Sequence, residues 1–149
     1  MSKAHKKERA PLIFVKAVGK LMPVDDIAEE ALSKLKFGEE VAIEIKKPKN
    51  IKLLRKFWAL VTIVYNNQDR YPTRENVADA LKLSTGVYSM IELPGGHVFR
   101  IPGSIAEMDA TEFSQFYERV CDVIAKSYLP GVTVAWLRAE VESLIGVSY

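Results

Sequence analysis

The stretch Lys46-Lys47-Pro48-Lys49-Asn50-Ile51-Lys52-Leu53-Leu54-Arg55-Lys56-Phe57-Trp58-Ala59-Leu60 joins a cationic segment to an apolar one. Six of the twelve residues from Ile45 to Lys56 are basic and none is acidic. From Ile51 onward, apolar residues recur at spacings of three and four, which predicts a helix to about Asn67 with Asn50 as its N-cap. Lysines at the positive end of a helix suit the binding of phosphates.

Two apolar stripes run side by side along this predicted helix. The first comprises Ile51, Leu54, Trp58, Val61 and Tyr65, and the second comprises Leu53, Phe57, Leu60 and Val64. Lys52, Arg55 and Lys56 take the remaining face. A helix this apolar needs a core or a subunit interface around it, so the pattern predicts a homodimer. The stripes also favour Phe57 and Trp58 as core residues, with stacking on nucleic-acid bases as the alternative.

The rest of the chain indicates an α+β protein. A short strand at Leu12–Val15, a helix from Asp25-Asp26 to about Leu35 and a strand alternating at Val41, Ile43 and Ile45 predict a β-α-β start. Ile27, Ala31, Leu32 and Leu35 would form the buried stripe of that first helix. The long central helix follows, then a second helix capped by Thr73, a β-hairpin around Pro94-Gly95-Gly96-His97, and two C-terminal helices capped by Asp109 and Thr133.

Charge is distributed unevenly along the 149 residues. Residues 1–56 carry 14 Lys and Arg against 8 Asp and Glu, whereas residues 57–149 carry 7 against 11. We expect residues 1–10 to be a basic flexible arm, with Lys6, Lys7 and Arg9 as additional phosphate contacts, and residues 11–149 to form a single α+β domain. Within that domain the composition allows two sub-units, 11–49 and 50–149.

Several classes of chemistry lack the residues that they need. Cys121 is the only cysteine, and His5 and His97 are far apart, which predicts neither a metal site nor a disulfide. Converging carboxylates, a Gly-rich phosphate loop and a nucleophile elbow are also missing, so we expect no catalytic residues, no cofactor and no small-molecule substrate. No apolar run has the length of a membrane span and no signal segment follows the charged N-terminus, which predicts a cytoplasmic protein without a membrane partner.

The run Arg55-Lys56-Phe57-Trp58-Ala59-Leu60 resembles the Arg-Lys-Leu-Trp-Ala run of the bacteriophage lambda Orf (NinB) family of recombination mediators. It also resembles a related family of uncharacterised phage and prophage early-region proteins. The order of elements over most of residues 12–140 is similar as well, including the hairpin and the helix at Glu112-Phe113. Leu53-Leu54 stand where the mediators carry a Gln-Asn pair, so any hydrogen-bonding role of that pair is absent from this chain.

The resemblance implies a homodimer that binds single-stranded DNA in the bacterial host cell and cooperates with the host single-strand-binding protein to help a recombinase load. Binding would proceed without catalysis. Two alternatives stay open: a phage protein that modulates a host replication or defence protein, and a small nuclease or regulator of duplex DNA. The candidate nucleic-acid-binding residues are Lys46, Lys47, Lys49, Asn50, Lys52, Arg55 and Lys56.

Overall fold

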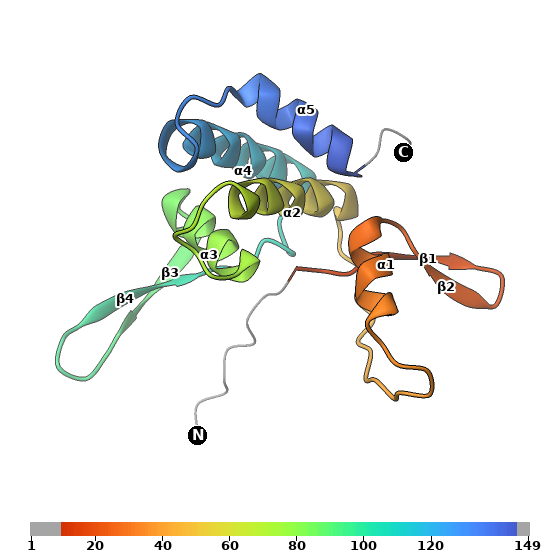
Figure 1. Cartoon of the computed structure of the whole chain (residues 1–149). Coiled ribbons are helices and arrows are strands. Elements are labelled where there is room, and N and C mark those ends of the chain that lie inside the picture. The colour runs from red at the N-terminus through yellow and green to blue at the C-terminus, as the bar shows by residue number, and fades with distance from the viewer. Residues whose placement is uncertain (1–9, 146–149) are drawn as a thin grey trace. The chain divides into compact units, whose positions relative to one another are not determined.

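The computed structural model describes residues 10–145, so the predicted contacts of Lys6, Lys7 and Arg9 lie outside the described residues. The described chain is α+β, with five α-helices and two separate two-stranded antiparallel sheets (Figure 1). It divides into two compact units, which we call the N-terminal unit (residues 10–46) and the C-terminal unit (residues 47–145). Each unit is described by itself below.

The N-terminal unit is a β-hairpin followed by a helix. Strands β1 (Phe14–Ala17) and β2 (Lys20–Pro23) pair antiparallel, and Gly19 takes a φ of 70° in the turn between them. Helix α1 (Asp26–Ser33) begins after Asp25, whose carboxylate accepts a hydrogen bond from the backbone N–H of Ala28 at 2.9 Å. The acidic start predicted for this helix is therefore a true N-cap.

The predicted β-α-β start is wrong. The first strand pairs with its immediate successor, and residues 39–48 belong to neither a helix nor a strand. The predicted buried stripe of α1 is wrong as well, since Ile27, Leu32 and Leu35 are exposed and Ala31 is only half-buried. Among residues 10–46, Ala28 is the one buried residue. This unit therefore has almost no core of its own.

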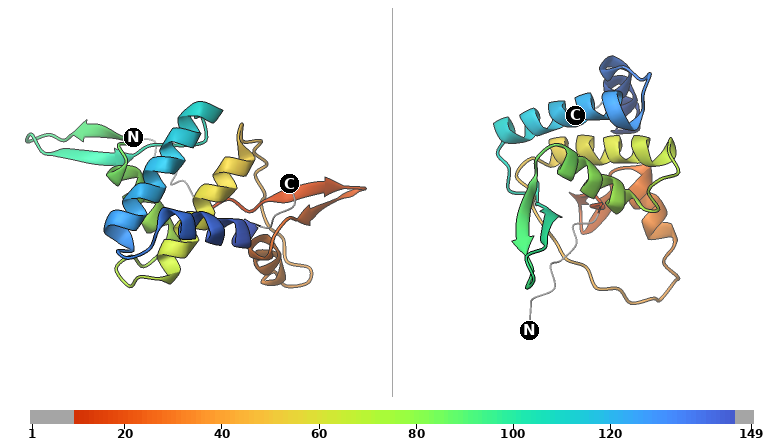
Figure 2. Two further views of the ribbon diagram at one scale, coloured as in Figure 1. Left: turned by 90° about the horizontal axis from the view of Figure 1, so that it is seen from above. Right: turned by 90° about the vertical axis from the view of Figure 1, so that its left-hand side faces the viewer.

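Helix α2 (Ile51–Asn66) is the centre of the C-terminal unit, and the sequence predicted its span to within a residue. It lies between α3 (Arg74–Ser84) on one side and α4 (Ala110–Val123) and α5 (Val134–Ile145) on the other, and it contacts all three (Figures 1 and 2). Both apolar stripes are largely buried by these helices. The apolar faces of α2 are thus buried within one chain, and they give no reason to place a subunit interface on this helix.

Hydrogen bonds at the helix starts confirm three predicted caps. Thr73 Oγ1 accepts from Asn76 N at 3.1 Å, Asp109 Oδ1 accepts from Glu112 N at 2.8 Å, and Thr133 Oγ1 accepts from Trp136 N at 3.1 Å. The predicted hairpin is also present, as β3 (Tyr88–Glu92) paired with β4 (Val98–Pro102), and it projects from the helices of this unit (Figures 1 and 2).

Helix α4 continues into a π-helical turn, η1 (Ile124–Tyr128). The backbone N–H of Leu129 donates to the carbonyl of Ile124, five residues earlier, at 2.8 Å. Tyr128 at its end is held by α3, because its hydroxyl lies 2.6 Å from Ser84 Oγ, and its ring lies 6.2 Å from that of Tyr71. The sequence predicted where this helix stops, at Pro130-Gly131, but not the wider turn before the stop.

Candidate nucleic-acid interface

Six of the seven predicted binding residues lie at the start of the C-terminal unit, and Lys46 is the last residue of the N-terminal unit. The side chains of Lys46, Lys47, Lys49 and Lys52 are exposed, and Lys56 is half-buried. We call Lys47, Lys49, Lys52 and Lys56 the α2 lysine surface. The remaining two predicted residues, Asn50 and Arg55, make structural contacts that their sequence positions did not reveal.

Arg55 does not lie on the solvent-facing side of α2 as predicted. It is 9% exposed, and its Nη2 donates a hydrogen bond to the carbonyl of Ile145 at 3.4 Å. Ile145 is the last residue of α5, where helix carbonyls lack an intrahelical partner and carry the negative end of the helix dipole. A guanidinium suits that position, so Arg55 ties α2 to the end of α5 rather than offering a charge to a phosphate.

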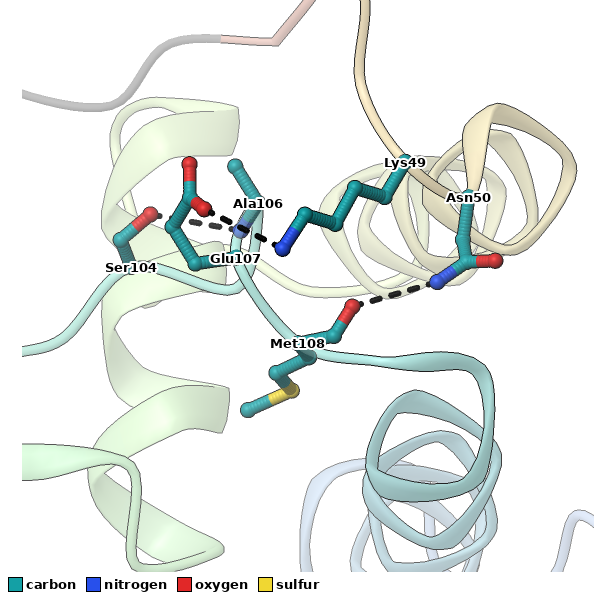
Figure 3. Close-up of polar contacts among 6 residues, drawn as sticks. All are labelled: Lys49, Asn50, Ser104, Ala106, Glu107 and Met108. Carbon is teal, nitrogen blue, oxygen red and sulfur yellow. Dashed lines mark hydrogen bonds and ion pairs between the residues drawn. The ribbon is translucent and has the colours of Figure 1, made fainter.

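Lys49 is one half of an ion pair. Its Nζ lies 3.7 Å from Glu107 Oε2, and both side chains are largely exposed (Figure 3). The backbone N–H of Glu112 lowers the pKa of the Asp109 carboxyl by hydrogen bonding, and the charge of Lys49 lowers it further. The hydrogen bond with Asp109 raises the pKa of the Glu112 carboxyl. The charge of Lys49 thus acts on three acidic residues, and an incoming phosphate must compete with Glu107 for it.

Asn50 occupies the N-cap position of α2, but its side chain is used elsewhere. Its Nδ2 donates to the carbonyl of Met108 at 3.1 Å and so fastens the start of α2 to the loop before α4 (Figure 3). Among the described residues, no side chain caps α2 and no acidic residue lies in its first turn. In α1, α3 and α4, by contrast, a side chain caps the first turn and at least one acidic residue lies in it. The first amides of α2 thus have no side-chain acceptor among the described residues and keep the partial positive charge of a helix start.

Lys52 and Lys56 are one helical turn apart, a rise of about 6 Å. Lys52 points to solvent, whereas Lys56 Nζ lies 6.0 Å from the ring centre of Tyr117 on α4. A cation above an aromatic face is weakly held and keeps its outer side hydrated. Within helix α2 itself, these two lysines are therefore the members of the α2 lysine surface that can contact a phosphate.

Phe57 and Trp58 are core residues, as the stripes favoured. Phe57 is fully buried and Trp58 is 7% exposed. The ring of Phe57 lies 5.3 Å from that of Phe116 and 5.5 Å from that of Trp58. A base could stack on Phe57 only after α2 and α4 had separated, and Trp58 exposes too little of its surface to offer a stacking face. Any contact of this surface with nucleic acid therefore uses charge and not these aromatics.

The loop before α4 is the part of the site that the sequence did not reveal. Glu107 and Met108 contact the start of α2 across 58 residues of chain, and no local pattern identifies such a neighbour.

The burial of Lys82 on α3 was also not predicted from the sequence, and this lysine is only 1% exposed. The helical spacing of Val77, Ala78 and Leu81 would have placed position 82 beside the buried face of α3.

Residues 10–145 contain no group of three or more His, Cys, Asp and Glu side chains placed to hold a metal ion. Within the same part of the chain, no helix is long and apolar enough to cross a membrane. Cys121 is buried, and this burial raises the pKa of its thiol. Comparisons with protein-family models, with curated proteins and with solved structures find no match to the chain.

Proposed function

We propose that this protein binds single-stranded DNA through its backbone phosphates, without catalysis, as an accessory protein of homologous recombination in the cytoplasm of a bacterial host. The observation that carries the proposal is the α2 lysine surface next to a helix start without a side-chain cap. Lys46 precedes this surface in the chain and adds one more positive charge. The host single-strand-binding protein is the partner that the resemblance to phage mediators implies.

Two features support phosphates as the ligand. Lys52 and Lys56 project from one face of a helix whose interior is fixed by the core, so their positions are held while their amines stay hydrated. The amides in the first turn of α2 add fixed partial charges of the same sign. Lysines attract phosphates as point charges, and this attraction does not distinguish one base from another.

The preference for a single strand rests on the resemblance to the phage mediators. Burial of Phe57 and Trp58 removes the aromatic platform that many single-strand binders use. Binding should then depend on salt more than on base composition, and it should be weaker than that of proteins which combine charge with stacking.

A titration of labelled single-stranded and duplex oligonucleotides at several salt concentrations, followed by fluorescence anisotropy, tests the proposal. With four to five lysines at phosphates, the plot of log affinity against log salt should have a slope of about −3 for single strands. Replacing Lys52 and Lys56 with alanine should reduce that slope by about 1.4 and the affinity by about 25-fold at 0.1 M salt.

The matched control replaces two other exposed basic residues of the same unit, Arg119 and Lys126, with alanine. It removes the same net charge, so it should retain affinity if the contacts are local to α2. Equal losses of affinity in the two double variants would mean that binding depends on the overall charge and not on the position of the lysines. A flat salt response, or a clear preference for duplex DNA, would exclude the proposed function.

A further inference from the structure

The hairpin of the C-terminal unit carries a single arginine and no lysine, and this arginine lies over an aromatic ring. The guanidinium carbon of Arg100, on β4, is 4.9 Å from the ring centre of Tyr88, on β3. The strand register pairs Arg100 with Met90 and Tyr88 with Pro102, so Arg100 and Tyr88 are diagonal neighbours on one face of the ribbon. A guanidinium is held at such a ring by its charge and by the contact of two planar groups.

The other side of this arginine is open to a ligand. Arg100 is exposed, and no carboxylate of residues 10–145 lies within ion-pair distance of it. The ring of Tyr88 lies against one side of the planar guanidinium, which leaves the opposite side and the N–H groups along its edge for another partner. A nucleotide matches both of these features, because its base is flat and its phosphate is negative.

We propose that the exposed side of the Arg100 guanidinium stacks on one base of the single strand whose phosphates the α2 lysine surface binds. This inference rests on the proposed function and adds one contact with a base to it. The ring of Tyr88 orients the guanidinium before the strand arrives, so less side-chain freedom is lost on binding. Every base has a π face, so a stacking contact adds affinity without selecting a sequence.

The base of the hairpin is fixed to helix α3, so the place of Arg100 in the C-terminal unit is defined. The backbone N–H of Val87 donates to the carbonyl of Lys82 at 2.9 Å, and the N–H of Gly103 donates to the carbonyl of Val87 at 3.0 Å. A Cβ on Gly103 would lie 3.2 Å from Val87 Cγ1, which is closer than an ordinary van der Waals contact. The two ends of the ribbon therefore meet closely beside the end of α3.

A short loop joins the hairpin to the α2 lysine surface. Strand β4 ends at Pro102, and Glu107, five residues later, forms the ion pair with Lys49 (Figure 3). Five residues of chain span at most about 18 Å. The base of the hairpin and the start of α2 are therefore near enough, within one compact unit, for a single strand to contact both.

Phe99 is the alternative stacking group on the same hairpin. Its side chain is 53% exposed, but it lies on the face opposite to Arg100 because successive residues of a strand alternate in direction. Phe99 pairs with Ile91, and this face of β3 and β4 carries no lysine or arginine. A base on Phe99 would thus have a ring to stack on but no cation for its phosphate. We therefore place the base on the Arg100 face and use Phe99 as the control.

The test compares a single-stranded DNA oligonucleotide with one of the same length in which abasic sites replace the bases. Both carry the same phosphates, so the α2 lysine surface should bind them alike. Fluorescence anisotropy at a fixed salt concentration should give an affinity about ten-fold higher for the strand with bases. Arg100→Lys keeps the charge and removes the planar group. It should lose most of this preference and bind the abasic strand within about two-fold of the original chain.

Phe99→Ala is the matched control, and it should keep the preference for the strand with bases. Arg100 and Phe99 are both exposed, so neither substitution should alter the fold, which circular dichroism verifies. Equal affinity of the original chain for both strands, with a normal salt slope, would overturn the stacking contact and leave the proposed function standing. Full preference in Arg100→Lys, or its loss in Phe99→Ala, would also overturn the contact. No binding to either strand would overturn it together with the proposed function.

Discussion

Replacing Arg55 with alanine should lower stability and leave nucleic-acid binding unchanged, which is the reverse of what its place in a basic run predicts. The replacement removes two methylene groups, Cγ and Cδ, from a residue that is 9% exposed, and each buried methylene contributes about 0.8 kcal/mol. The hydrogen bond to Ile145 is long, at 3.4 Å, so we assign it about 1 kcal/mol or less. The free energy of unfolding should therefore fall by about 2 kcal/mol.

Urea denaturation followed by circular dichroism measures this change, with two matched variants beside it. Arg55→Met keeps an unbranched apolar stem without the charge, so it should recover most of the packing and lose the hydrogen bond to Ile145. Lys52→Ala lies three residues earlier and is exposed, so its stability should stay within about 0.5 kcal/mol of the original.

For oligonucleotide binding, we expect the reverse order of effects: the substitution at Lys52 should matter and the substitution at Arg55 should not. Lys52→Ala should reduce the salt slope by about 0.7, whereas Arg55→Ala should leave it unchanged. An Arg55→Ala protein that is as stable as the original and has lost part of the salt slope would refute the reasoning. The guanidinium would then reach a phosphate in solution and its contact with α5 would be dispensable.

Three further changes test the core and the caps. Phe57→Ala should lower the free energy of unfolding by about 3–5 kcal/mol in urea denaturation, because the ring is fully buried. Phe99→Ala, at a half-exposed side chain of the hairpin, should change this free energy by no more than about 0.5 kcal/mol, and the opposite order would contradict the packing of α2. Thr73→Ala should lower the free energy of unfolding by about 1 kcal/mol through loss of the α3 cap, and an unchanged midpoint would show that the cap is not formed. The Cys121 thiol, with a pKa raised by burial, should react slowly with a thiol reagent at pH 8 until denaturant is added. Above about pH 8.5 the unfolded chain loses the thiol proton while the folded chain still keeps it, so the stability that comes from the buried neutral thiol is complete below that pH and declines as the pH rises further. Rapid labelling of the folded protein would contradict the burial.

The helices of the C-terminal unit could be predicted because their signals are local. The alternating spacings of three and four in α2, and the cap residues Thr73, Asp109 and Thr133, act within one or two helical turns. The segment at Val41, Ile43 and Ile45 carries an equally regular pattern, yet it forms no strand in the described chain. A strand exists only when a second strand accepts its hydrogen bonds, and a pattern along one segment does not supply that neighbour.

The site could be predicted in its charge but not in its contacts. Density of lysines is visible in the sequence, and Lys47 and Lys52 are exposed as expected. Arg55 is buried because the end of α5, ninety residues away, offers it a carbonyl. Asn50 has the right residue type for an N-cap, but Met108 takes its side chain instead. Both differences come from segments remote in the chain, and residue type alone did not distinguish a surface charge from a tie between helices.

The π-helical turn at Ile124–Tyr128 makes the length of the chain at this point matter as much as its composition. A π turn holds one residue more than an α turn, so removing a single residue from it would restore regular α-helical hydrogen bonding. Without the deletion, a change of the same residues to α-helical geometry would rotate the residues after them by about 100° relative to those before. Tyr128 would then be turned away from Ser84 and Tyr71. A chain shortened by this residue should thus have a more regular helix and keep the contact that joins it to α3, whereas the full-length chain keeps that contact only through the π turn.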